Sequence, residues 1–292
     1  METSGEYLQL TGLIIKNAGY KGLLINTTNS TYSNIEVAYS MDSGVQLRAG
    51  ANIIKNCDSH DNFDYRLASA DYFRPGFSSD GFSDKLHSNA SNTFIGCRSW
   101  NNGDDGFDFF SRYTTDYTKL IDCWSFSNGI TNIDMTKHPK YELDKEWFVK
   151  FENGYTIYSA NKSKTFNNTC YPGFGNGNGF KLSGNCIAHN VELSNCIALN
   201  NRMKGFDQNS NFGEMHLSNC IAARNKRWDY GFWRKNGILV LDNCVAEGEN
   251  CFNIADKTGN VKTQKVGITT ANLLAPRKED GSLPDLNVND NE

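Results

Sequence analysis

Residues 191–199 read VELSNCIAL and residues 215–223 read MHLSNCIAA, so one apolar pattern returns after 24 residues. Each stretch is too short for a periodic helix and is bounded by asparagine or glycine, as is typical of short β-strands. A period of roughly 20 to 50 residues indicates a stacked architecture, in which each unit buries its apolar face against its neighbours. These two stretches therefore predict a solenoid of short strands.

Three markers recur in phase along the chain. A glycine followed by a large apolar residue occurs at Gly22, Gly44, Gly81, Gly106, Gly154, Gly179, Gly205 and Gly231. Cysteines follow 13 to 17 residues later, at Cys57, Cys97, Cys123, Cys170, Cys196, Cys220 and Cys244. Five residues beyond the cysteine, asparagine recurs at Asn62, Asn102, Asn128, Asn201 and Asn225. This phase predicts an all-β, right-handed parallel β-helix with coils of about 24 residues and a strand at every half turn.

The cysteines and asparagines are predicted to form two ladders inside this solenoid. The nine cysteines are odd in number and none lies in a CxxC pair, which argues against both disulfides and thiolate metal sites. A stacked free cysteine instead behaves as a small buried hydrophobe. Asparagine tolerates left-handed turns, and its amide can hydrogen-bond to the coils above and below. We therefore expect both ladders to be structural.

Irregular steps between the glycines define the expected domain organisation. Steps of 37 and 48 residues interrupt steps of 22 to 26, which places loop insertions near residues 60–79 and 130–150. Solenoids carry insertions at turns, often on the binding face. We expect the β-helix to occupy residues 1–256 as a single domain, and residues 257–292 to form a covering segment and a tail.

Composition excludes several classes of protein. The formal net charge of −4 at pH 7 lacks the basic footprint of a nucleic-acid binder. Apolar runs stay well below the roughly 18 to 20 residues of a membrane span. The first residues, METSGEYLQL, show no basic region followed by an apolar core, so no secretory signal is visible. We expect a monomer that binds neither nucleic acid nor membranes.

The stacking brings acidic residues together. Asp80 and Asp105 each precede a marker glycine, so they are expected one coil apart, at about 4.8 Å between backbones. Asp104 and Asp108 lie beside them, and four unpaired carboxylates would repel one another. A single aspartate beside glycine is more often a turn residue. The cluster favours a cation, and Ca²⁺ suits it better than Mg²⁺ because Ca²⁺ tolerates irregular oxygen coordination.

One lysine shares the outward column of these aspartates. Counting two residues after each marker glycine gives the column Ser83, Asp108, Thr156, Lys181, Asp207 and Trp233. If Gly154 marks a coil, Lys181 lies two coils from Asp108, at roughly 10 Å between backbones. A sugar ring fits such a gap. Other basic residues near the markers are expected to be solvated, namely Lys85, Lys204, Arg202 and Arg224.

Four motifs in order carry a resemblance to a known family. DGFSDKLH at 80–87, CRSWNNGDDGFD at 97–108, CWSFSNG at 123–129 and NGNGFKLSGN at 176–185 resemble the family 9 polysaccharide lyases, which are calcium-dependent pectate lyase β-helices. The resemblance runs from roughly Asn56 to Asp285. It implies that Lys181 is the Brønsted base, that Ca²⁺ is the cofactor and that the protein is secreted or periplasmic. The implied calcium ligands are Asp80, Asp104, Asp105 and Asp108.

The reaction implied by this resemblance is β-elimination on a pectic polysaccharide, with polygalacturonate as the expected substrate and an alkaline optimum. A rhamnogalacturonan lyase of the same family is the first alternative. A β-helical glycoside hydrolase is another, but the Gly-His-Gly and Arg-Ile-Lys strings that mark polygalacturonases do not occur. The alternative from a different class is a non-catalytic glycan-binding protein or adhesin with structural calcium.

Overall fold

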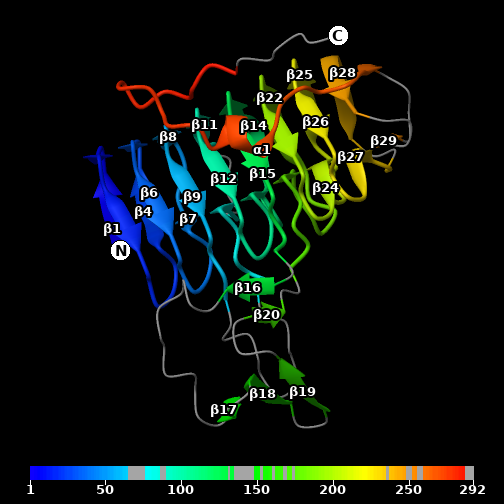
Figure 1. Cartoon of the computed structure of the whole chain (residues 1–292). Coiled ribbons are helices and arrows are strands. Elements are labelled where there is room, and N and C mark those ends of the chain that lie inside the picture. The colour runs from blue at the N-terminus through cyan, green and yellow to red at the C-terminus, as the bar shows by residue number, and fades with distance from the viewer. Residues whose placement is uncertain are drawn as a thin grey trace.

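The computed structural model describes residues 1–64, 76–85, 90–130, 132–134, 148–151, 154–159, 162–166, 170–172, 175–234, 237–247, 252–254 and 259–286. Strands dominate these residues, and one short helix, α1 (Thr270–Leu273), follows the last strand. The strands stack into successive coils (Figure 1). No helix in the described ranges is both long and apolar enough to cross a membrane.

One side of every coil contributes a strand to a nine-stranded sheet, which we call sheet A. Its neighbours pair in parallel. In spatial order they are β1 (Glu2–Glu6), β4 (Leu23–Thr28), β7 (Val45–Leu47), β10 (Phe82–Asp84), β13 (Phe107–Asp108), β21 (Phe180–Lys181), β24 (Lys204–Asp207), β27 (Trp228–Phe232) and β29 (Phe252–Ile254).

The other two sides join through β28 (Ile238–Ala246) into one parallel sheet, sheet B. One arm contains β2 (Gln9–Thr11), β5 (Thr31–Ser33), β8 (Ile53–Lys55), β11 (Thr93–Ile95), β14 (Thr114–Ile121), β22 (His189–Ser194) and β25 (Glu214–Ser218). The other arm contains β26 (Ile221–Ala223), β23 (Ile197–Leu199), β15 (Trp124–Phe126), β12 (Arg98–Trp100), β9 (Asp58–His60), β6 (Glu36–Ala38) and β3 (Ile14–Lys16). β30 (Gly259–Thr263) also pairs with β28, so parallel pairing continues beyond residue 256.

The right-handed parallel β-helix is confirmed, but each coil has three strands where the sequence predicted two. VELSNCIAL is split by Asn195, whose φ of 54° turns the chain between β22 and β23. Asparagine adopts this left-handed conformation readily, so a single residue makes a corner. The same corner recurs with positive φ at Asn34, Asn56, Gly96, Asp122, Asn219 and Asn243.

Aromatic and cysteine columns fill the interior. The rings of Phe82, Phe107, Phe180 and Phe206 stack successively with centroids 4.9 to 5.0 Å apart. Tyr230 continues the stack 5.2 Å beyond Phe206. Tyr230 therefore takes the place expected of Phe232, because β27 pairs with β24 two residues out of phase with the glycine marker. The buried free cysteines form the second column, at Cys57, Cys97, Cys123, Cys196, Cys220 and Cys244.

The asparagine ladder is confirmed at every predicted position. The backbone N–H and side-chain amide of Asn102 both donate to Asn128 Oδ1, at 3.2 and 2.9 Å. Asn128 donates in the same way to Asn201, and Asn201 to Asn225. The side-chain oxygen of each buried asparagine thus accepts hydrogen bonds from the asparagine one coil earlier. The ladder therefore fixes the stacking of the turns.

One predicted coil is absent. Gly154 begins β18 (Gly154–Ser159), which pairs antiparallel with β17 (Phe148–Phe151) and β19 (Lys162–Phe166). Cys170 lies in β20 (Cys170–Pro172), which pairs antiparallel with β16 (Asn132–Asp134), so it is not part of the cysteine column. Since β13 pairs directly with β21, the described strands from β16 to β20 contribute nothing to the coils, so the insertion extends beyond the predicted 130–150. Most of the other predicted insertion, at 65–75, lies outside the described residues.

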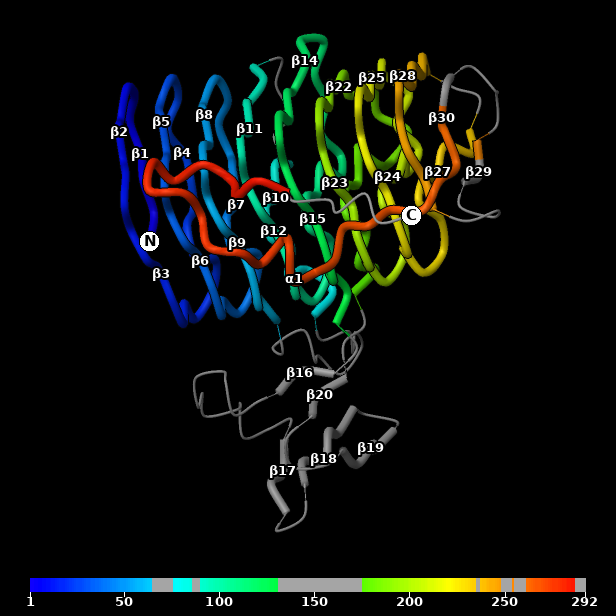
Figure 2. The backbone as a smooth tube through the Cα atoms, turned by 45° about the horizontal axis from the view of Figure 1, so that its top comes forward, coloured from blue at the N-terminus to red at the C-terminus, as the bar shows by residue number. Residues whose placement is uncertain are grey.

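A C-terminal segment, residues 264–286, runs back across the coils (Figure 2). Val266, Ile268 and Leu273 pack on the aromatic and aliphatic side chains of β15 and β23. Asp58 anchors the segment, because Arg277 of the segment donates to the Asp58 carboxylate at 2.6 Å. Arg98 of β12 donates to the same carboxylate at 2.7 Å. These contacts hold the described part of the segment against β15, β23 and Asp58.

Candidate metal site and its lysines

The stacking of β10, β13 and β21 sets the geometry of the site. A Cβ added to Gly106 would lie 1.9 Å from Ser125 Oγ and 2.8 Å from Gly179 O, so only glycine allows the coils to approach this closely. In the resulting register Ser83 faces Asp108, and Asp108 faces Lys181. The outward side chains of three successive strands are thereby brought into one column.

Three of the predicted aspartates meet on this face. One carboxylate oxygen from each of Asp80, Asp105 and Asp108 lies within 4.8 Å of the others. All three residues are at most 1% exposed. We call these three residues the aspartate cluster. Buried carboxylates this close together need compensating positive charge.

Lys181 supplies part of that charge. Its Nζ lies 2.9 Å from Asp105 Oδ2 and 3.4 Å from Asp108 Oδ1. The prediction that Lys181 shares the face of the aspartates is confirmed, but the expected gap of two coils is wrong. Lys181 and Asp108 lie on directly paired strands, because the insertion contributes no coil between them.

A second lysine, Lys85, also enters the cluster. Its Nζ lies 2.6 Å from Asp108 Oδ2 and 3.0 Å from Asp80 Oδ2. The sequence interpretation of Lys85 as a solvated surface residue is therefore wrong. Asp80 precedes β10 and Lys85 directly follows it, so the long side chain of Lys85 reaches back along the strand to the cluster.

Asp104 lies beside the cluster but outside it. Its Oδ1 accepts hydrogen bonds from the backbone N–H groups of Asn176 and Gly177, at 2.5 and 3.4 Å. These bonds tie the turn before β13 to the turn before β21. The neighbouring Asp105 behaves differently, since its Oδ1 accepts from Asn178 while its Oδ2 faces Lys181.

Burial and neighbouring charges shift the pKa values of the four aspartates in different directions. Burial raises the pKa of Asp80 to about 7, against the opposing effect of Lys85. Burial also raises the pKa of Asp104 and Asp105. For Asp108, the charges of Lys181 and Lys85 outweigh burial and lower the pKa to about 2. The cluster thus holds more carboxylates than its two lysines can keep ionised at neutral pH.

The same interactions hold Lys181 in its charged form. Burial alone would lower its pKa, but the surrounding carboxylates, Asp105 first, raise it well above the ordinary lysine value. Lys181 is therefore an ammonium in this structure. Its pKa would fall if the negative potential around it were reduced.

The donor set fits a hard divalent cation. Carboxylate oxygens are the ligands that Ca²⁺ prefers, and the cluster offers three buried carboxylates within one ligand shell. Two neutral oxygens beside them, Ser83 Oγ and Gln46 Oε1, are buried without a hydrogen-bond partner in the described part of the protein. They lie on β10 and β7, in register with each other and with Asp108. Orphaned acceptors at this place are expected where a cation and its waters belong.

Of the remaining basic residues, Lys204 departs from the expectation of a solvated surface, whereas Arg224 is exposed as expected. Lys204 donates to Asp207 at 2.6 Å, and its side chain is 9% exposed. Arg202 donates to Gly175 O, and Arg224 donates to Val266 O. Each therefore has a structural contact. Lys204 and Asp207 form a second lysine–aspartate pair on sheet A, one strand beyond Lys181.

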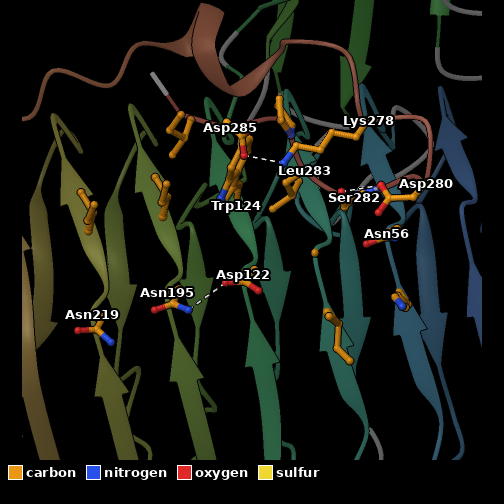
Figure 3. Close-up of a pocket in the computed structure, with 17 residues that line it drawn as sticks. Asn56, Asp122, Trp124, Asn195, Asn219, Lys278, Asp280, Ser282, Leu283 and Asp285 are labelled. Carbon is orange, nitrogen blue, oxygen red and sulfur yellow. Dashed lines mark hydrogen bonds and ion pairs between the residues drawn. The ribbon is translucent and has the colours of Figure 1, made fainter. Parts of the chain in front are cut away.

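A groove of about 700 Å³ lies at a different corner of the solenoid, beside the C-terminal segment (Figure 3). Its floor includes Trp124 and the corner residues Asp122 and Asn195, while Leu283 and Asp285 form a wall. The residues lining it do not include the aspartate cluster or either of its lysines. The groove is therefore separate from the aspartate cluster on sheet A.

Comparison with known sequences finds relatives that are named as pectate lyases. A family model described as the Pel9A-like right-handed β-helix region matches residues 1–142. Pectate lyase L of Dickeya dadantii (strain 3937) is 29% identical over 212 residues, covering 72% of this chain and 40% of that protein. Pectate lyase PEL9 of Emericella nidulans is 29% identical over 217 residues, covering 71% of this chain and 45% of that protein. The chain thus spans less than half the length of these relatives.

Solved structures support the same fold. The crystal structure of pectate lyase Pel9A matches with a TM-score of 0.69 and 24% identity, covering 97% of this chain and 63% of that chain. A rhamnogalacturonan lyase matches with a TM-score of 0.64 and 20% identity, covering 97% of this chain and 68% of that chain. Both structural matches extend over nearly the whole of this chain.

Proposed function

Because this chain belongs with the Pel9A-like right-handed β-helix proteins of the family 9 polysaccharide lyases, we propose that it is the catalytic β-helix of a calcium-dependent pectate lyase. The proposed reaction is β-elimination on polygalacturonate, which leaves a 4,5-unsaturated uronate end. The observation that carries the proposal is the contact of Lys181 with two buried carboxylates of a cluster suited to Ca²⁺.

The residues that would hold the ion are the aspartate cluster and Asp104. Asp80, Asp105 and Asp108 offer oxygens close enough to share one cation. Asp104 uses Oδ1 for two backbone amides, and its carboxylate would add negative charge beside the ion. Ca²⁺ takes six to eight oxygen ligands, so water or a substrate carboxylate completes the shell.

The chemistry supplied by a bound Ca²⁺ is positive charge, which offsets the carboxylates around Lys181 and the charge of the uronate itself. Lys181 then has a lower pKa and a neutral amine is accessible at alkaline pH. Nζ of Lys181 takes the proton from C5 of the uronate. The C5–H electron pair forms the C4=C5 double bond, the C4–O bond breaks, and the departing oxygen receives a proton from water.

Substrate choice is the finer part of the proposal. The curated relatives are named as pectate lyases, which favours polygalacturonate. Rhamnogalacturonan is the second candidate, because a solved rhamnogalacturonan lyase shares the fold. We further propose that the protein is secreted or periplasmic, because the relatives are named as pectate lyases, and that it acts as a monomer.

A product assay tests the function. Purified protein is incubated with polygalacturonate or with rhamnogalacturonan, in calcium and in chelator, and the ultraviolet absorbance of the unsaturated product is followed. We expect product from polygalacturonate in calcium and a strong loss in chelator. Turnover that survives chelation contradicts the metal assignment, and reducing ends without an unsaturated product identify a hydrolase. Calcium binding without turnover on either polymer favours the glycan-binding alternative.

A further inference from the structure

The carboxylates that would hold a divalent ion already contact two lysine ammonium groups. Lys85 Nζ bridges Asp80 Oδ2 and Asp108 Oδ2, at 3.0 and 2.6 Å. Lys181 Nζ contacts Asp105 Oδ2 and the other oxygen of Asp108. The two ammonium groups together therefore contact all three carboxylates.

The two lysines differ in how they reach the cluster. The side chain of Lys85 is 32% exposed, whereas that of Lys181 is 9% exposed. Lys85 follows the last residue of β10, while Lys181 lies within β21 and is paired on both sides. Lys181 also packs over Phe110, with Nζ 4.9 Å from the ring centroid. Lys85 alone can withdraw toward solvent on its flexible stem without disturbing a strand.

Coordination and the Lys85 ion pair need the same oxygens. Ca²⁺ binds carboxylate oxygens at about 2.3 to 2.6 Å, and Lys85 contacts the same oxygens at 2.6 and 3.0 Å. An ion that took Asp80 Oδ2 and Asp108 Oδ2 as ligands would compete with the ammonium for the same two oxygens. Two cations held by these oxygens repel each other strongly, so the ion and the Lys85 ammonium exclude one another.

We infer that Lys85 is the built-in counter-ion of the aspartate cluster, that it is displaced when Ca²⁺ binds, and that the displaced ammonium then pairs with the carboxylate of the bound uronate. This inference rests on the proposed function. Lys85 is thus a positioning residue: it keeps the metal-free cluster folded and, in the loaded protein, orients the sugar. Its compact charge and three rotatable donors suit both partners.

Calcium titration tests the competition. Lys85→Met keeps the stem and removes the charge, so Ca²⁺ no longer competes with an ammonium. We expect its calcium Kd, measured by calorimetry without substrate, to fall at least about tenfold below that of the unaltered protein. Lys119→Met is the control, because Lys119 pairs with Glu192 at 3.8 Å on an exposed face. An unchanged or weaker calcium Kd in Lys85→Met overturns the inference.

Thermal unfolding of the same variant guards against a folding defect. In chelator, Lys85→Met should unfold at a lower temperature than the unaltered protein, because two carboxylates lose their partner. In saturating Ca²⁺ the two proteins should unfold at similar temperatures. A deficit of equal size in both conditions would mean that Lys85 is only a structural ion pair, and would also overturn the inference.

Kinetics at saturating Ca²⁺ test the second role. Lys85→Met should raise KM for polygalacturonate by about tenfold or more with a smaller change in kcat, whereas Lys85→Arg, which keeps the charge, should recover most of the affinity. An unchanged KM in Lys85→Met would contradict the pairing of Lys85 with the substrate carboxylate. If the unaltered protein binds no calcium, the proposed function fails together with this inference. If it binds calcium and forms product while Lys85→Met titrates identically, only the inference fails.

Discussion

Asp108 and Asp207 are two aspartates with the same place in the repeat and different surroundings. They lie on β13 and β24, in one column of sheet A with Lys181 between them. The Oδ1 of each accepts the backbone N–H two residues further on, from Phe110 at 2.8 Å and from Asn209 at 3.0 Å. Each also pairs with a lysine. The solenoid therefore builds the same local structure twice.

Charge count separates the two positions. Asp207 has one lysine partner, Lys204, at 2.6 Å, so the pair is balanced. Asp108 shares two lysines with the other carboxylates of the cluster, so negative charge is in excess. A balanced buried pair stabilises a turn, whereas excess buried carboxylate creates affinity for a cation. The variants below are expected to separate a cation site from an ion pair on one scaffold.

The largest difference is expected between the two buried lysines. Lys181→Ala should lower kcat on polygalacturonate by roughly 10² to 10⁴, the range for loss of a general base. Lys204→Ala removes an equally buried ammonium one strand away and should lower kcat far less. Ultraviolet assay of the unsaturated product at saturating calcium gives both values. Equal losses would mean that neither lysine is the base.

The next difference is expected in calcium affinity. Asp108→Asn keeps the shape of the side chain and removes one charge from the cluster, so calcium Kd measured by calorimetry should rise at least about a hundredfold. Asp207→Asn makes the same change at the balanced pair. Its calcium Kd should stay close to that of the unaltered protein. A matching loss in both variants would place the ion elsewhere on sheet A.

The repeat was predictable because its markers act locally. Gly106 is needed where coils approach closely, Asn128 where an amide must satisfy the next turn, and Cys123 where a small apolar group must stack. Gly154 misled the interpretation because a glycine followed by an aromatic residue also begins a strand of an antiparallel sheet. Spacing alone cannot distinguish a coil from an insertion of similar length.

The composition of the site was only partly predictable. The column from Asp108 to Lys181 followed from the repeat, although its spacing did not. Lys85 was missed because its ammonium reaches the cluster along the strand rather than across paired strands. The bonds of Asp104 to the turn at Asn176 were also invisible, since the partner lies beyond the insertion. Periodicity places backbones, whereas the reach of long side chains depends on the packed surface.

The dependence of folding stability on pH should reveal the excess of buried carboxylates in the aspartate cluster. Because the pKa of Asp80 rises to about 7 in the folded protein, the fold retains a proton that the unfolded chain loses near pH 4. The contribution of Asp80 to the stability of the metal-free protein should therefore fall as pH rises from about 4 to 7, by roughly 4 kcal/mol at about 1.36 kcal/mol per pKa unit, and the raised pKa values of Asp104 and Asp105 act in the same direction. The lowered pKa of Asp108, about 2, adds stability above pH 4 that is lost only in stronger acid.

Denaturant unfolding in chelator at several pH values measures this effect. Asp80→Asn should make the decline between pH 4 and 7 less steep, while Asp207→Asn should leave it in place. Calcium should stabilise the unaltered protein more at pH 8 than at pH 5, because the ion binds ionised carboxylates. Metal-free stability that rises across this window, with the Asp80→Asn variant behaving identically, would contradict the buried-acid origin of the slope.

The smallest effect is expected where a buried polar side chain has every partner it needs. Asn128 donates to Asn201 Oδ1 and Ser125 Oγ at 3.0 Å, and accepts two bonds from Asn102. Asn128→Ala leaves the donors of Asn102 without this acceptor, which should cost about 1 to 3 kcal/mol in denaturant unfolding. Its calcium Kd should not change, because the ladder faces the interior and carries no charge. A large loss of calcium affinity in Asn128→Ala would show that the cluster depends on coil stacking as much as on its own carboxylates.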